Sequence, residues 1–169
     1  VRSVLKLRKD IASRLIQFED EGSLELAERP GEIIEKIASI IEGVRDARLL
    51  PEKDAIGFDP NNVAAMIEAL AARGIGGDMM RRLLQGPALS PAIWGMEHKL
   101  SDHTLTHSGT ALMNWCVGNA KVEMRGNGNL ITKQSSGRAK VDPLHAAFCA
   151  AILMSWNPAA SVKSFWEAA

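Results

Sequence analysis

The stretch KDAIGFDPNNVAAMIEALAARGIGGDMMRRLL, residues 53–84, carries the clearest information about the fold. Residues 53–58 (KDAIGF) have the pattern of a short buried strand, and residues 78–86 (DMMRRLLQG) predict a second one. Between them, apolar residues at helical spacing precede a terminal Gly74, and this set is Val63, Met66, Ile67 and Leu70. Strand, helix and strand in this order form a crossover unit, which predicts a parallel pair of strands and an α/β fold.

Further helices and a hairpin are predicted on both sides of this unit. Helical spacing indicates a first helix over residues 4–18, with Gly22 as its end, and a second helix that starts at Pro30 and continues through Val44. Three more helices are expected at residues 90–100, capped by Ser90, at 108–119, and from Leu144 to near the WNP at residues 156–158. Residues 121–133 (KVEMRGNGNLITK) alternate around a Gly/Asn turn, which predicts a β-hairpin.

Length and composition are those of one ordinary globular domain over residues 1–169. Hydrophobic residues make up 46% of the 169 residues and charged residues 24%. The two cysteines lie in apolar runs, which favours buried thiols in a reducing compartment over a disulfide scaffold. The apolar run 146–154 is far shorter than the ~20 residues that cross a bilayer. Because the chain opens directly in helix-like sequence at Val1, we expect it to be part of a longer polypeptide.

Charge is distributed unevenly along the chain although the net charge is zero. Residues 19–54 hold eleven acidic and five basic residues, net −6, whereas residues 121–140 hold five basic residues and one acidic residue, net +4. The basic residues of this second block are Lys121, Arg125, Lys133, Arg138 and Lys140. The block is either a solvated hairpin or a surface that contacts the phosphates of a polyanion such as DNA.

Two aspartates, Asp59 and Asp142, each stand directly before a proline at an expected helix start. Aspartate is a good helix cap, contributing ~1 kcal/mol, and proline suits the first helical turn, so both can be ordinary caps. Alternatively, both carboxylates bind one shared cation. Ligands of open α/β sheets gather at the carboxyl ends of strands, where Asp59 is expected, and Mg²⁺ and Mn²⁺ prefer carboxylate oxygens.

Other motifs give weaker signals. His98, His103 and His107 lie close together, as in some zinc sites, but neither cysteine pairs nor a glutamate between the histidines accompany them. The glycine-rich pieces at residues 73–78 and 125–129 lack the pattern of a phosphate-binding loop. No GxSxG elbow supports a nucleophilic serine.

Three segments, read in order, are similar to a known family. AIGFDP (55–60), THSGTALMNWCVGNA (106–120) and GNLITKQSSGRAKVDPLHAAFCAAI (128–152) resemble the carboxyl-terminal nuclease domain of the terminase large subunit of tailed bacteriophages. The resemblance runs from about residue 54 to 154 and is looser in the two N-terminal helices. Its most specific string is His107, Trp115, Asn119, Lys133, Lys140, Asp142 and Ala146.

The resemblance implies a ribonuclease H-like fold, a mixed sheet flanked by helices, and a two-metal site for Mg²⁺ or Mn²⁺. It implies cleavage of concatemeric double-stranded DNA during packaging, in the host cytoplasm at the assembling capsid, with the portal and the small terminase subunit as partners. Asp59 and Asp142 then match metal-binding catalytic acids. Lys133 and Lys140 match lysines near the site, and His107 and Asn119 match supporting positions.

The sequence also departs from the family pattern. The initial strands of the fold, the first of which carries the first catalytic acid, and the ATPase half have no counterpart here, so we expect a truncated nuclease domain that is weak or inactive alone. Two rival functions stay open. One is a module without catalysis that docks on DNA or on packaging proteins through the basic hairpin, and the other is a small zinc protein built on the three histidines.

Overall fold

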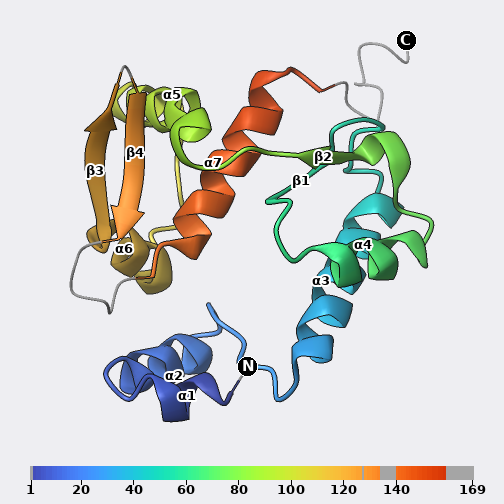
Figure 1. Cartoon of the computed structure of the whole chain (residues 1–169), viewed down its shortest axis with the longest axis horizontal. Coiled ribbons are helices and arrows are strands. Elements are labelled where there is room, and N and C mark those ends of the chain that lie inside the picture. The colour runs from blue at the N-terminus through green and yellow to red at the C-terminus, as the bar shows by residue number, and fades with distance from the viewer. Residues whose placement is uncertain (1, 127, 134–139, 159–169) are drawn as a thin grey trace. The chain divides into compact units, whose positions relative to one another are not determined.

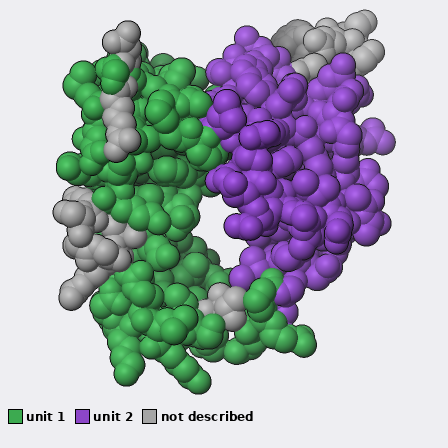
Figure 2. Space-filling view, viewed as in Figure 1, with its two compact units in different colours: residues 1–30, 85–151 green, residues 31–84, 152–169 purple. Residues whose placement is uncertain are grey.

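The structure is a computed structural model that describes residues 2–126, 128–133 and 140–158. Contacts within the chain divide it into two compact units, which Figure 2 shows in green and purple. Unit 1 comprises Val1–Pro30 and Gln85–Ala151, and unit 2 comprises Gly31–Leu84 and Ile152–Ala169. The expectation that residues 1–169 form one domain stays a prediction.

Unit 2 contains the predicted crossover. Helix α3 (Pro30–Asp46) comes first, and β1 (Ile56–Phe58), α4 (Ala64–Ala71), η1 (Gly77–Met79) and β2 (Met80–Arg82) follow (Figure 1). β1 and β2 pair in parallel, with Ile56 opposite Met80 and Phe58 opposite Arg82. The parallel pair predicted from the sequence is therefore confirmed.

The core of unit 2 forms where α3 and α4 meet the strands. Ala38, Leu70 and Ile75 are buried, and partly buried side chains such as Ile56 and Met66 pack against them. Gly74 has a φ of +71°, the left-handed conformation common after a helix end, and it turns the chain toward Ile75. This packing places the carboxyl end of β1 at a fixed position relative to α4.

Gly57 in β1 has no space for a side chain. A Cβ at this position would lie 2.5 Å from Cδ1 of Leu83 and 3.0 Å from Cδ1 of Leu153. We therefore expect Gly57→Ala to lower the free energy of unfolding by about 1–3 kcal/mol, the usual cost of overpacking, measured by urea denaturation. Gly43→Ala is the matched control, because a Cβ at Gly43 inside α3 meets nothing within 4 Å. An unchanged stability of Gly57→Ala would show that the two leucines move aside without cost.

Unit 1 combines helices with an antiparallel hairpin. Its elements are α1 (Val4–Leu7), α2 (Ala12–Asp20), η2 (Gly86–Leu89), α5 (Ser90–Ser101), α6 (Ala111–Gly118), β3 (Ala120–Arg125), β4 (Gly128–Lys133) and most of α7 (Asp142–Ser155). The hairpin and the last helix agree with the sequence prediction. The strands of the described residues form two separate two-stranded sheets, one parallel and one antiparallel.

The hairpin packs on η2 and α5 through alternate residues of β4. Asn129 and Ile131 are buried, and the backbone N–H of Asn129 donates to Oγ of Ser90 at 2.9 Å. The predicted helix cap at Ser90 is wrong, since Leu89 precedes α5 as its N-cap and no side chain caps this end. The Ser90 hydroxyl instead accepts the Asn129 N–H, a bond between residues 39 positions apart.

The N-terminal helix predicted over residues 4–18 is broken into α1 and α2. Arg8 leaves the helical conformation, with φ −120° and ψ 61°, and its guanidinium donates to both oxygens of Asp10 at 3.1 and 3.0 Å. Farther along, α2 buries Phe18, whose ring lies 5.6 Å from that of Trp115 in α6. Among the described residues, no helix has the length and apolar character to span a membrane.

Candidate metal centre and nucleic-acid interface

Asp59 directly follows β1 and is exposed. Its Oδ1 accepts hydrogen bonds from the backbone N–H of Asn61 at 3.0 Å and from Nδ2 of the same residue at 2.7 Å. This is an Asx turn, in which an aspartate side chain holds the backbone two residues on. Helix α4 begins only at Ala64, so the expectation of an Asp-Pro helix start at residues 59–60 is wrong. Asn62, with a φ of +57°, inserts a turn between strand and helix, and this turn fixes the carboxylate.

Asp142 is the first residue of α7 and is also exposed. It belongs to the first helical turn, where the positive end of the helix dipole favours a carboxylate. Within the described residues, no side chain donates a hydrogen bond to it. Burial raises the pKa of the Cys116 thiol in α6, and the negative charge of Asp142 adds to this increase. The start of α7 thus lies close to α6.

The two acids belong to different units, Asp59 to unit 2 and Asp142 to unit 1. A cation shared between them therefore stays a prediction. Within the described residues there is no group of three or more His, Cys, Asp or Glu side chains that could hold a metal. Mg²⁺ commonly binds through one or two carboxylates together with water and substrate phosphates. Asp59 and Asp142 each offer a carboxylate of the kind that this ion accepts.

The three histidines considered as zinc ligands are exposed. His98 lies beside Trp94 with ring centroids 6.0 Å apart, and His103 follows α5 with a φ of +56°. Nδ1 of His107 accepts the backbone N–H of Gly109 at 3.1 Å and so shapes the loop ahead of α6. This local bond is the kind of supporting contact predicted for His107, although its part in any reaction stays a prediction.

Asn119 connects the end of α6 to the entrance of α7. Its Nδ2 donates to the backbone carbonyl of Lys140 at 3.2 Å. Lys140 stands two residues before Asp142, so this bond holds the chain that leads into the candidate acid. Asn119 therefore contacts the predicted site segment through the backbone, and its effect on a reaction stays a prediction.

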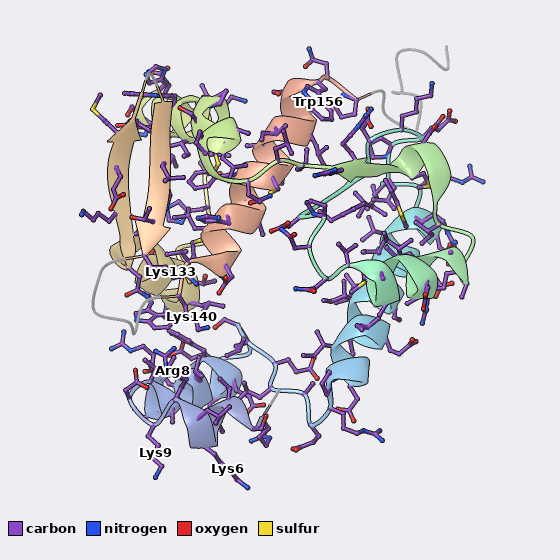
Figure 3. All side chains as sticks on the ribbon, in the orientation of Figure 1. Lys6, Arg8, Lys9, Lys133, Lys140 and Trp156 are labelled. Carbon is purple, nitrogen blue, oxygen red and sulfur yellow. The ribbon has the colours of Figure 1, made fainter. Side chains whose placement is uncertain are left out.

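The five basic residues of the predicted DNA surface differ in their surroundings. Nζ of Lys121 lies 3.4 Å from Oε1 of Glu123, so its charge is partly offset. Lys133 is exposed at the end of β4, and Lys140 is half-buried before α7; both are labelled in Figure 3. The side chain of Arg125 and the whole of Arg138 lie outside the described residues. Among the described side chains of this set, Lys133 and Lys140 are thus the two whose charge is available for phosphates.

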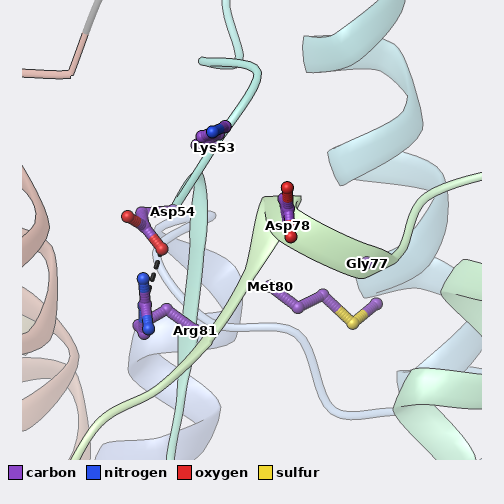
Figure 4. A pocket seen from close by; sticks show the side chains of 6 residues that line it. All are labelled: Lys53, Asp54, Gly77, Asp78, Met80 and Arg81. Carbon is purple, nitrogen blue, oxygen red and sulfur yellow. Dashed lines mark hydrogen bonds and ion pairs between the residues drawn. The ribbon is translucent and has the colours of Figure 1, made fainter.

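A shallow polar depression of about 210 Å³ in unit 2 was not predicted from the sequence (Figure 4). It is lined by Lys53, Asp54, Gly77, Asp78, Met80 and Arg81. Nε of Arg81 donates to Oδ1 of Asp54 at 2.6 Å, and this bond lowers the pKa of the Asp54 carboxyl. The parallel register, which brings the two strand starts together, is the signal that could have located it. Since Asp54 and Arg81 neutralise each other, the depression offers no free catalytic group from this pair.

The fold is similar to a solved structure. The crystal structure of the HK97 bacteriophage large terminase matches 89% of this chain with a TM-score of 0.67 and 18% sequence identity. This likeness confirms the predicted ribonuclease H-like α/β fold class. The chain spans 31% of the length of that protein.

The family follows from a second comparison. Residues 32–158 match the family model described as "Terminase large subunit, endonuclease domain", which is 127 of the 169 residues. The chain belongs to this family. A comparison with curated protein sequences found no match.

Proposed function

We propose that this chain is the nuclease part of a phage or prophage DNA-packaging terminase, a hydrolase that cuts concatemeric double-stranded DNA with Mg²⁺ or Mn²⁺. Asp59 and Asp142 are its metal-binding acids. The observation that carries the proposal is the setting of these acids. Both are exposed carboxylates within the family-matched residues 32–158, one fixed by an Asx turn after β1 and one at the start of α7.

The residues of the proposed site have different roles. The Asx turn orients Asp59, and the start of α7 positions Asp142. A divalent cation, when bound, stabilises the negative charge that develops on the phosphodiester oxygens. Lys133 and Lys140 attract the DNA backbone and offset the repulsion between phosphate and carboxylate. His107 and Asn119 hold the loops on either side of α6.

The family also supplies the setting of the proposed reaction. We place the chain in the host cytoplasm at the assembling capsid, with the portal and the small terminase subunit as protein partners. These assignments rest on the family alone, because the contacts described above involve no second protein.

Plasmid cleavage with and without metal tests the proposal. We expect the 169-residue chain to cut plasmid DNA weakly in Mg²⁺ or Mn²⁺ and not at all in EDTA, because two carboxylates supply few of the oxygen ligands that two cations need. The longer protein implied by the family should cut efficiently with the same metal requirement. Salt-dependent DNA binding by that longer protein, with no cleavage in any divalent metal, would instead favour the docking module without catalysis.

A further inference from the structure

A basic N-terminal segment, defined here by Lys6, Arg8 and Lys9, lies outside the family-matched residues 32–158. We propose that this segment is a second contact surface for the phosphates of double-stranded DNA, which extends the surface formed by Lys133 and Lys140. The inference rests on the proposed function only in taking DNA as the partner. It assigns a role to a segment that the family match leaves without one.

Two of the three cations of this segment, Lys6 and Lys9, are available for a ligand. Lys6 and Lys9 are exposed, and within the described residues neither makes an ion pair or a hydrogen bond through its side chain. Arg8 is different, since its guanidinium is held by Asp10 at 3.0 Å. Arg8 is therefore engaged at the break between α1 and α2, and Lys6 and Lys9 on either side of it carry the charge that is not paired.

Three neighbouring acids are paired with arginines rather than with these lysines. Asp10 is taken by Arg8, while Glu19 and Glu28 pair with Arg2 at 2.8 and 2.9 Å. Lys6 and Lys9 are thus the cations of this segment with which no described carboxylate forms an ion pair.

The segment and the hairpin lysines are attached to the same helix. Phe18 of α2 packs its ring against Trp115 of α6, and Asn119, which follows α6, holds the carbonyl of Lys140. Lys133 pairs in register with Ala120, the residue after Asn119. All these residues belong to unit 1; in Figure 3, Lys133 and Lys140 lie near α6, and Lys6 and Lys9 extend from the lower edge of the α1/α2 pair.

This distribution favours a long polyanion as the partner. A small phosphate ligand needs cations that converge on one point, whereas these lysines stand on separate elements, α1, the loop after it, β4 and the entrance of α7. Duplex DNA carries a negative charge about every 1.7 Å along its axis, so separated lysines each find a phosphate. The segment would position the duplex without reading its sequence.

Binding to a fluorescent duplex in EDTA tests the inference, since cleavage is then switched off. In the full 169-residue chain, Lys6→Ala with Lys9→Ala is expected to weaken binding roughly tenfold near 0.1 M salt and to reduce the slope of log K against log salt by about 2. Lys53→Ala with Lys99→Ala is the matched control, because it removes two exposed lysines elsewhere. Circular dichroism and urea denaturation confirm that each variant is folded.

Three results would overturn the inference. Equal weakening in the control would show that only net charge matters. Unchanged binding of the Lys6/Lys9 variant, with weakened binding of Lys133→Ala and Lys140→Ala, would remove the segment from the surface while leaving DNA as the partner. Absence of any DNA binding by the unaltered chain would overturn both this inference and the DNA partner. If the chain binds DNA but the metal-dependent cleavage assay shows no cutting, the proposed nuclease activity is contradicted. The inference about the basic N-terminal segment then still stands.

Discussion

Asp142→Asn is expected to reduce Mg²⁺-dependent cleavage of double-stranded DNA by more than about a hundredfold in the longer protein that the family implies. Loss of a residue that only supports a metal ligand commonly costs about 10–100-fold, so loss of a ligand itself should cost more. Asparagine keeps the size of the side chain and can occupy the first turn of α7, so folding should be intact. Plasmid cleavage and urea denaturation, measured on the same preparation, separate the two effects.

Substitutions at Asp59 separate a metal role from a turn role. Asp59→Asn retains the carbonyl oxygen that Asn61 contacts, so it should preserve the Asx turn and still suppress cleavage as strongly as Asp142→Asn. Asp59→Ala removes both functions and should also lower stability. Asp102→Asn, an exposed acid after α5, is the control for loss of charge. Normal cleavage by Asp59→Asn would reduce Asp59 to a residue that shapes its turn.

Phe18→Ala is expected to lower the free energy of unfolding by about 3–5 kcal/mol, the usual cost of emptying a buried phenylalanine site. Phe18 is only 2% exposed, and its ring lies 5.6 Å from that of Trp115. The same change should weaken DNA binding if the basic N-terminal segment contributes, because α2 loses its attachment to α6. Urea denaturation followed by tryptophan fluorescence measures the first effect, and the duplex titration in EDTA measures the second.

Ile16→Ala provides the comparison for this substitution. Ile16 lies on the same helix but is 42% exposed, so its truncation removes less buried surface and should change stability far less. If Ile16→Ala and Phe18→Ala destabilise the chain equally, the ring contact with Trp115 contributes little and α2 is held by other interactions.

Local periodicity predicted the parts of the fold in which one apolar face decides the structure. The parallel pair β1–β2, helix α3, the hairpin and α7 follow from spacing that is readable within a single stretch of sequence. The break after α1 could not be read in that way, because the apolar spacing continues across Arg8, whose backbone leaves the helical conformation. The local sequence likewise favours a cap at Ser90, because the actual partner of its hydroxyl, Asn129, is distant in the sequence.

The candidate site was predicted to a different degree. Spacing alone left Asp59 and Asp142 as either caps or ligands, and the family resemblance favoured ligands. Asp59 is not the N-cap of α4, because its side chain accepts a hydrogen bond from Asn61 well ahead of the start of that helix. The depression beside Asp54 was missed because it arises from strand register, which brings residues 27 positions apart into contact.

The hydrogen bond from Asn119 to the Lys140 carbonyl joins residues 21 positions apart. It therefore connects the two ends of the segment that contains the hairpin. The entrance of α7 is therefore tied directly to the end of α6, by a route that bypasses the tip between β3 and β4. Because the entropy of closing a loop rises only slowly with its length, the tip can lengthen or shorten at small energetic cost. Evolution can thus vary the hairpin while the backbone that leads into Asp142 keeps its anchor.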